Sequence, residues 1–442
     1  MFPKDFLWGA ASSSYQVEGA YRQDGKGLSI WDALTQGRIA HGENGQIACD
    51  HYNRYRQDVA LMKQIGLKSY RFSVSWPRII PAEDGRVNER GLQFYSDLVD
   101  ELRAAGIEPM VTLYHWDLPL WAHRKGGWKN SAIADWFAAY TKVVVEALSD
   151  RVKYWITLNE PQYFMGFGYV IGQAAPYSKA WLSIPRIARN ILLAHGKAVK
   201  TIRQYAGQQV RVGFAPTGQS YIPRSEDAED IAFARAHTFG AQFAMFANTW
   251  WCDPVYLGRN MEIPKHRVLE RLIALSDREL EEVSQPLDFC AFNVYNSTNY
   301  NEGKKPNPAV YPGMPRTAMN WPVTPEVLYW STRFFYERYR LPILITENGM
   351  ANCDFKMSDG KVHDPQRIDF MRGYLLQLQR AIDEGIPVMG YQYWSLMDNF
   401  EWGEGFDKRF GLIHVDYRTQ ERTPKDSAWW YREVIDSNAA IL

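Results

Sequence analysis

The sequence has few cysteines for its 442 residues, four in all. Cys49, Cys252, Cys290 and Cys353 are scattered along the chain. They form no CxxC pair, and their spacing fits no zinc signature. Isolated thiols of this kind are typical of a reducing compartment rather than of disulfide-linked secreted proteins. We therefore expect a cytoplasmic protein with neither a disulfide framework nor a metal site.

Long apolar runs are also missing. No stretch approaches the roughly 18 uncharged apolar residues that a membrane span requires. The first ten residues, MFPKDFLWGA, lack the charged segment followed by an apolar one that marks a signal peptide. The expectation is a soluble protein that does not enter a membrane.

Neither sign of charge is in excess, because 50 Lys and Arg residues balance 50 Asp and Glu residues. A nucleic-acid-binding protein needs a basic face, and no run of Lys and Arg supplies one. The glycine-rich patterns GxGxxG and Walker A, which bind phosphate, are absent as well. These absences exclude nucleic acid as a partner and predict a neutral or weakly charged small-molecule substrate and no cofactor.

Aromatic residues, by contrast, are abundant: 17 Trp, 26 Tyr and 21 Phe, which is 14% of the chain. Most of them are expected to fill a large core. Some could line a binding site, since flat apolar rings suit the C–H face of a sugar and their N–H and O–H groups suit its hydroxyls.

Short apolar segments alternate with longer helical patterns along the whole chain. The predicted strands are 6–11, 69–75, 108–114, 153–158, 210–215, 288–295, 342–346 and 387–394. The predicted helices are 51–65, 90–104, 132–148, 186–204, 325–339, 366–384 and 425–436. Such alternation implies a parallel sheet covered on both faces. Eight strands in one chain favour an α/β fold of the (β/α)₈ TIM-barrel class, a single domain over residues 1–442.

The predicted irregular stretches and the polar strand ends indicate where function lies. Residues 296–324 and 349–363 follow barrel strands, on the face where barrels keep their active sites. Glu160 and Glu347 each end an apolar strand. One such glutamate could simply form a salt bridge. Two of them facing each other across a barrel mouth meet the requirement of glycoside hydrolysis, in which one carboxyl stays protonated and the other ionised.

In this setting the sequence resembles glycoside hydrolase family 1, the family of β-glucosidases and β-galactosidases. Residues 6–20 (FLWGAASSSYQVEGA) resemble its N-terminal signature. Residues 157–161 (TLNEP) resemble its acid/base motif, and residues 345–349 (ITENG) its nucleophile motif. The three motifs occur in order, and the resemblance extends from Phe2 to about Trp430.

The resemblance implies a role for each of five residues. Glu160 would be the general acid and then the base, and Glu347 the nucleophile that forms a covalent glycosyl-enzyme with overall retention of configuration. The implied separation of the two carboxyl groups is about 5–5.5 Å. Arg71 and Tyr295 would contact Glu347 and keep its pKa low. Asn159 would bind the 2-hydroxyl of the sugar.

The same resemblance implies a substrate pocket. Its hydroxyl-binding residues would include Gln16, His115, Glu401 and Trp402, with Trp394 as the stacking platform, although an isolated His or Trp would more readily be a packing residue. Trp321 resembles the family's aglycone-stacking tryptophan. The predicted substrate-binding residues are Gln16, His115, Trp116, Asn159, Asn293, Trp321, Trp394, Glu401, Trp402 and Phe410.

Two features bear on substrate choice. Relatives that act on 6-phosphoglycosides carry Ser at the position of Glu401, with a nearby Lys and Tyr. Here Lys408 is present, but Phe410 stands where that Tyr would be. A carboxylate at 401 would repel a phosphate, which predicts an unphosphorylated sugar. On the aglycone side, Gln162 replaces a common Trp, and residues 173–177 (QAAPY) depart from the common His-Ala-Pro-Gly.

The sequence thus predicts a retaining exo-β-glycosidase that hydrolyses terminal β-glucosyl, β-fucosyl or β-galactosyl residues. Three alternatives stay open: a non-catalytic carbohydrate-binding barrel, a 6-phospho-β-glucosidase, and an enzyme whose main reaction is transglycosylation. The residue types do not distinguish the three hexoses, and they leave the oligomeric state open.

Overall fold

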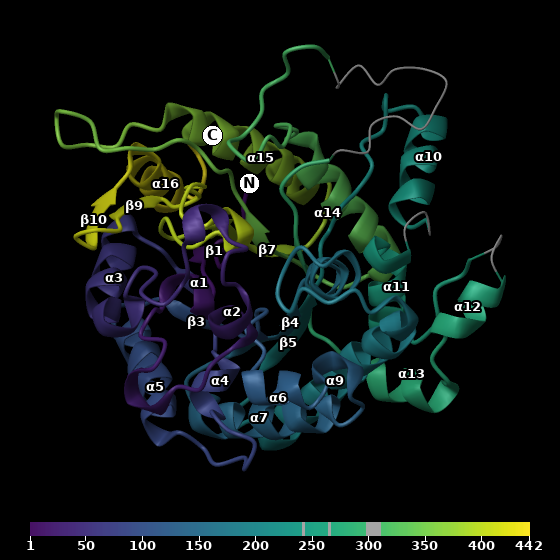
Figure 1. Cartoon of the computed structure of the whole chain (residues 1–442). Coiled ribbons are helices and arrows are strands. Elements are labelled where there is room, and N and C mark those ends of the chain that lie inside the picture. Colours follow the sequence, from purple (N-terminus) through teal and green to yellow (C-terminus); the bar gives the residue numbers. More distant parts are fainter. Residues whose placement is uncertain (241–243, 264–266, 298–310) are drawn as a thin grey trace.

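The computed structural model describes residues 1–240, 244–263, 267–297 and 311–442. Strands lie at its centre and helices surround them (Figure 1). The central strands form one parallel sheet, in the order β5-β4-β3-β2-β1-β8-β7-β6. The strands are β1 (Leu7–Ala11), β2 (Ser69–Ser73), β3 (Glu108–Tyr114), β4 (Tyr154–Asn159), β5 (Arg211–Ala215), β6 (Cys290–Asn293), β7 (Ile343–Asn348) and β8 (Val388–Trp394). Each lies within one residue of a predicted segment or inside it, except that β7 continues to Asn348, two residues beyond its predicted end.

The two outer strands, β5 and β6, meet and close the sheet into a barrel. Asn293 N donates to Pro216 O at 3.0 Å, and Gly218 N donates to Asn293 O at 2.7 Å. Lower down, Asp288 N donates to Val212 O at 2.9 Å. Because β5 and β6 are hydrogen-bonded to each other, the sheet has no open edge there, and the predicted (β/α)₈ barrel is confirmed.

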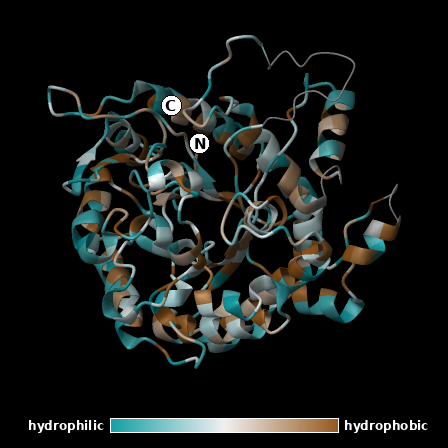
Figure 2. Ribbon diagram, in the orientation of Figure 1, coloured by the Kyte–Doolittle hydropathy of each residue, from teal (hydrophilic) through white to brown (hydrophobic). Residues whose placement is uncertain are grey.

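Helices between the strands cover the outside of the barrel. The predicted ones are present as α3 (His51–Ile65), α5 (Glu89–Ala104), α7 (Ile133–Leu148), α9 (Ile184–Tyr205), α14 (Glu326–Tyr339), α15 (Pro365–Asp383) and α16 (Asp426–Asp436). Figure 2 shows hydrophilic and hydrophobic residues interspersed along these outer helices, as expected of helices that pack on one face only. Helix α3 ends at Gly66, whose φ of 81° is the left-handed conformation that glycine adopts without strain.

Several elements of the structure were not predicted. Between β5 and β6 lie α10 (Ala228–Thr238), α11 (Asn248–Cys252), α12 (Arg267–Ile273) and α13 (Asp277–Val283), with a π-helical turn at Asp253–Leu257. A hairpin of β9 (Ile413–Asp416) and β10 (Glu421–Pro424) precedes α16. These elements are short, or lack an apolar stripe as α10 does, so periodicity does not reveal them.

Of the two stretches predicted to be irregular, one is confirmed and the other is only partly described by the structure. Residues 349–363 contain neither a helix nor a strand longer than an isolated bridge. Of residues 296–324, positions 298–310 lie outside the described residues.

The inside of the barrel is a packed core and not a channel. Buried side chains from neighbouring strands form one cluster: Met110, Tyr154, Ile156, Ala215, Phe289, Ala291 and Leu344. Because the lumen is filled by these side chains, space for a ligand remains only beyond the strand ends. Among the described residues, no helix combines the length and apolarity that crossing a bilayer demands.

Candidate active site

A cavity of about 770 Å³ opens at the carboxyl ends of the strands, and both Glu160 and Glu347 line it. Most of the predicted site residues line this cavity too: His115, Trp116, Asn293, Tyr295, Trp321, Trp394, Glu401, Trp402 and Phe410. The other three, Gln16, Arg71 and Asn159, are fully buried behind the lining and bond to residues on it. The fold therefore brings together all fourteen positions, which range from residue 16 to residue 410.

Glu347, near the end of β7, is held at both carboxyl oxygens. Arg71 Nη1 donates to Oε1 at 2.6 Å, and Tyr295 OH donates to Oε2 at 2.6 Å. Burial raises the pKa of Glu347, while Arg71 and Tyr295 act to lower it. The predicted contacts are present, but the predicted low pKa is not, because desolvation outweighs the partners.

Glu160 stands at the sharp turn between β4 and α8 (Pro161–Met165). Its φ of 46° is left-handed, a strained conformation for a residue with a side chain and one often found at functional sites. Its backbone N donates to Ala215 O at 2.8 Å, which anchors the turn to β5. Burial, reinforced by repulsion from Glu347, raises the pKa of Glu160 to about 8. Of the two carboxyls, only Glu347 is in contact with Arg71, so this cation favours the ionised form of Glu347 more than that of Glu160.

Asn293 links the two carboxyl-bearing strands. Thr346 Oγ1 donates to Asn293 Oδ1 at 2.7 Å, which leaves the Nδ2 group to point the other way. Asn293 Nδ2 then donates to Glu160 Oε1 and to Asn159 Oδ1, at 3.0 Å each. These hydrogen bonds therefore fix the orientation of the Asn293 side-chain amide.

His115 has one ring nitrogen without a protein partner among the described residues. Arg71 Nη2 donates to Asn159 Oδ1 at 2.6 Å, so the Nδ2 group of Asn159 is the one that lies 3.2 Å from His115 Nε2. Nε2 must then accept, and the ring proton resides on Nδ1. His115 Nδ1 is buried without a protein partner among the described residues. Burial, together with the nearby charge of Arg71, holds the pKa of His115 well below its usual value, so the ring is neutral.

Gln16 and Glu401 form a second polar pair of the pocket. Gln16 Nε2 donates to Phe400 O at 2.9 Å and lies 3.3 Å from Glu401 Oε2. Burial and repulsion from Glu347 raise the pKa of Glu401 to about 8. This shift favours the neutral form of Glu401, and the preference for an unphosphorylated sugar stays a prediction. Lys408 Nζ lies 3.8 Å from Glu404, so this lysine is paired with an acid other than Glu401.

Aromatic rings form two walls of the cavity. On one side the Trp402 ring lies 4.7 Å from Trp116 and 4.5 Å from Trp31, centre to centre. Trp116 and Trp402 both have left-handed backbones, with φ of 76° and 50°. On the other side Trp394 packs with Phe410 and Trp321 in a separate apolar cluster. Aromatic surfaces beside polar groups such as His115, whose ring centre lies 5.7 Å from Trp394 and 6.0 Å from Trp402, suit a sugar ring, which is apolar on its faces and polar at its edges.

Comparison with known proteins places this arrangement in a family. The profile of Glycosyl hydrolase family 1 matches residues 1–440. Beta-glucosidase A of Thermotoga maritima is 43% identical over 445 residues, covering 99% of this chain and 98% of the relative. Beta-glucosidase A of Acetivibrio thermocellus is 44% identical over 448 residues, with the same coverage. The solved structure of beta-glucosidase from Thermotoga maritima in complex with methyl acetic acid-substituted glucoimidazole superposes with a TM-score of 0.90 at 40% identity, covering 99% of each chain.

The chain belongs to glycosyl hydrolase family 1. The predicted resemblance is thereby confirmed over almost the whole length of the chain.

Several residues of this family 1 cavity were missed by the sequence analysis. They lie on loops and short helices whose positions depend on the fold: Trp31, Arg38, Tyr163, Phe164, Phe167, Ala174, Ala175, Thr217, Gln219, Val294, Asn296, Met319, Gly403 and Glu404. Gln173, in the segment that departs from the family pattern, also lines the cavity. Gln162, the other departure, does not, because its fully buried side chain turns to Thr217 and accepts from its N at 3.3 Å.

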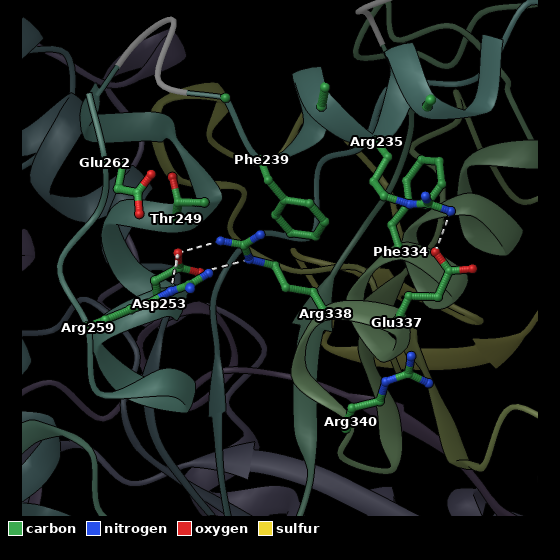
Figure 3. A pocket seen from close by; sticks show the side chains of 13 residues that line it. Arg235, Phe239, Thr249, Asp253, Arg259, Glu262, Phe334, Glu337, Arg338 and Arg340 are labelled. Atoms are coloured by element: carbon green, nitrogen blue, oxygen red, sulfur yellow. Dashed lines mark hydrogen bonds and ion pairs between the residues drawn. The ribbon is translucent and has the colours of Figure 1, made fainter. Parts of the chain in front are cut away.

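A second, larger hollow of about 1080 Å³ lies between α10, α11 and α14, apart from the family 1 site (Figure 3). Its arginines are largely engaged with its acids. Arg338 Nε donates to Asp253 Oδ1 at 2.9 Å, and Arg235 forms an ion pair with Glu337 at 2.6 Å. Two of the three acids that line this hollow are thus neutralised, so no pair of free carboxyls is available there for acid–base chemistry.

Metal coordination needs several close ligands. Within the part of the family 1 chain that the structure describes, no three His, Cys, Asp or Glu side chains gather in a way that would hold a metal ion.

Proposed function

We propose that this family 1 enzyme is a retaining exo-β-glycosidase that releases terminal β-glucosyl residues. The observation that carries the proposal is the unequal environment of two carboxyls in one cavity. Glu347 contacts a guanidinium and a phenol, whereas Glu160, with a pKa raised to about 8, keeps its proton. Similar proteins over the full length are named beta-glucosidases, which supports glucose as the sugar.

In the first step, the ionised Glu347 attacks the anomeric carbon of the sugar. The bond from that carbon to the glycosidic oxygen breaks as the new ester bond forms. Glu160 transfers its proton to the departing oxygen, so the leaving group departs as a neutral alcohol. Arg71 and Tyr295 hold both oxygens of Glu347 in place. The side chain therefore loses little conformational entropy on reaching the transition state.

In the second step, Glu160 acts as a base. Esterification removes the negative charge of Glu347, which is one of the causes that raise the pKa of Glu160. The pKa of Glu160 then falls, and its carboxylate takes a proton from water as that water attacks the anomeric carbon. Two inversions at the same carbon restore the original configuration.

Binding of the sugar falls to the polar groups around the two carboxyls. His115 Nδ1 lacks a protein partner and offers a neutral N–H to a hydroxyl. Glu401, protonated near neutral pH, both donates and accepts. Asn159 Nδ2, whose orientation Arg71 fixes, serves the 2-hydroxyl next to the reacting carbon. Trp394 supplies the platform beneath the ring, and Trp321 contacts the leaving group.

Galactosyl and fucosyl substrates belong to the same proposal. The hydroxyls at which these sugars differ from glucose meet the same types of side chain. Transglycosylation would follow the same steps, with a sugar hydroxyl in place of water. Analysis of products at high sugar concentration separates the two outcomes, because transfer yields longer glycosides and hydrolysis yields free sugar.

The test is kcat/KM on aryl β-glucoside, β-galactoside, β-fucoside and 6-phospho-β-glucoside in parallel. We expect the unphosphorylated glycosides to be hydrolysed, with release of the β-sugar as the first product. A preference for the phosphorylated sugar would overturn the assignment of the pocket around Glu401. Binding of cellobiose with no turnover of any glycoside would instead identify a non-catalytic carbohydrate-binding barrel.

A further inference from the structure

Arg38 is a cation at the mouth of the substrate cavity. It lies between α2 (Ile30–Leu34) and the short helix η2 (Ala40–Gly42), and it lines the same cavity as the two catalytic glutamates. No other Lys or Arg is found among the described residues of that lining. Arg38 is exposed, whereas Glu160 and Glu347 are 7% and 3% exposed. This difference in exposure places the Arg38 side chain toward the solvent end of the cavity.

The guanidinium of Arg38 is oriented but unpaired. Its central carbon lies 4.4 Å from the centre of the Tyr177 ring, a cation–π distance. Throughout the described ranges, no carboxylate comes within ion-pair distance of Arg38, and its guanidinium has no hydrogen-bond acceptor. A planar guanidinium that packs on an aromatic ring and has no acceptor within the described residues is suited to bind a planar anion such as a carboxylate.

The position of Arg38 decides which part of a substrate it meets. The sugar to be released occupies the closed end, among His115, Glu401 and the two carboxyls. The leaving group points outward from the proton donor, Glu160, and so toward the mouth. One acid, Glu404, lines the same rim, and Lys408 Nζ lies 3.8 Å from it, which reduces its repulsion of an approaching anion.

We propose that Arg38, held on Tyr177, binds a carboxylate on the leaving group, so that the enzyme favours β-glucosides with an anionic aromatic aglycone. This inference rests on the proposed function and narrows its substrate class. Trp321 and the Tyr163–Phe167 pair, whose ring centres are 5.2 Å apart, offer aromatic surfaces for the ring that bears the carboxylate. Arg38 acts on specificity and has no part in bond breaking.

The experiment compares two nearly isosteric substrates, carboxyphenyl and carbamoylphenyl β-D-glucoside, each as the 3- and 4-substituted isomer. The kcat/KM ratio of the charged to the neutral substrate is measured for wild type and Arg38→Gln. We expect Arg38→Gln to lower this ratio about fivefold for at least one isomer, as a partly exposed ion pair would. The ratio should also fall in wild type at about 1 M NaCl, where the screening length is about 3 Å. Glu404→Gln should raise the ratio.

The matched control is Arg22→Gln. Arg22 is also exposed and lies over a tyrosine ring, at 5.2 Å from Tyr21, but it does not line the cavity. This variant should leave the ratio unchanged. An equal ratio in wild type and Arg38→Gln, or an equal loss on both substrates, would overturn the proposal. If wild type hydrolyses neither glucoside, the proposed function fails. In that case the Kd values of the charged and the neutral glucoside are measured by calorimetry for wild type and Arg38→Gln. The change in the ratio of these two Kd values then tests the role of Arg38 separately from catalysis.

Discussion

Arg71 Nη1 donates to Glu347 Oε1 at 2.6 Å, and both side chains are almost completely buried. Three further hydrogen bonds hold the guanidinium, with Thr346 O at 3.0 Å, Thr112 Oγ1 at 3.1 Å and Asn159 Oδ1 at 2.6 Å. Arg71 therefore cannot turn away from Glu347 without breaking several hydrogen bonds. One buried cation thereby holds both the carboxylate proposed as the nucleophile and the amide proposed to bind the sugar.

Replacing Arg71 tests this arrangement. We expect Arg71→Met to lower kcat on an aryl β-glucoside by about 10²- to 10³-fold, the usual effect of removing one preorganised electrostatic contact. The acidic limb of the pH profile should move to higher pH, because Glu347 loses the cation that lowers its pKa. Arg71→Lys keeps the charge and should lose less activity. A variant with unchanged kcat and an unchanged acidic limb would contradict the role of the pair.

The proton on Glu160 predicts the basic limb of the pH profile. Burial and Glu347 raise its pKa to about 8, so the acid form required for the first step persists at neutral pH. We expect kcat/KM to fall as pH rises through about 8. Glu160→Gln should remove this limb and leave a measurable first step only with a dinitrophenyl leaving group, which departs without a proton. Full activity at pH 10 in wild type would count against Glu160 as the acid.

The nucleophile can be identified by chemical rescue. Glu347→Gly should abolish hydrolysis of an aryl β-glucoside, because no covalent glycosyl-enzyme can form. Azide should enter the space left by the carboxylate and attack the anomeric carbon directly. The product is then an α-glycosyl azide, formed with a single inversion, and it can be identified by nuclear magnetic resonance. Near-normal hydrolysis without azide would show that another residue is the nucleophile.

Glu401 links substrate binding to stability. Its pKa rises from the usual 4.5 to about 8 in the folded protein. Between these values the folded state holds a proton that the unfolded chain releases, so this group's contribution to the free energy of unfolding declines as pH rises. Glu401→Gln should flatten that decline, as measured by urea unfolding at pH 5 and pH 8. Identical pH dependence in wild type and variant would mean that Glu401 titrates normally.

A buried ion network supports the loop after β8 that carries Glu401. Lys425 Nζ lies 2.6 Å from Asp354 Oδ2 and 2.6 Å from Asp398 Oδ1, and all three side chains are at most 1% exposed. Lys425→Met leaves these acids without that cation, and removing one partner of a buried pair destabilises by about 3–5 kcal/mol. Urea unfolding measures the change.

The control for this variant is Lys356→Met. Lys356 pairs with Glu421 at 2.7 Å, but both side chains are exposed to solvent. Surface pairs of this kind contribute about 0–1 kcal/mol. A similar small loss in both variants would show that the network around Lys425 adds no more than a surface pair.

Much of the fold could be predicted because its elements carry strong local patterns. Helix α3 spans His51–Ile65, the bounds that its apolar spacing predicts, and β4 differs from its predicted segment by one residue at each end. The helices between β5 and β6 were missed because α10 exposes Ala232 and Phe233 to solvent and has no apolar stripe. Apolar periodicity predicts a helix only where the helix buries one face, so a helix without such a face is not predicted.

For the candidate site, the residue types could be predicted, but their electrostatics could not. Arg71 and Tyr295 contact Glu347 as expected, yet burial raises the pKa of that glutamate. Burial likewise raises the pKa of Glu401, where the sequence predicts a carboxylate. Desolvation depends on everything that packs around a group, so it cannot be read from the group's own motif.

The amino-acid sequence by itself determined the alternation of strands and helices and the placement of two glutamates at strand ends. Both follow from local patterns of apolar and polar residues along the chain. Only the tertiary structure decided that Arg71 meets Glu347 across 276 positions, that burial raises the pKa of Glu160, and that Arg38 lies over Tyr177 without an ion-pair partner among the described residues. These properties arise from burial and from contacts between distant segments, which exist only once the barrel has closed.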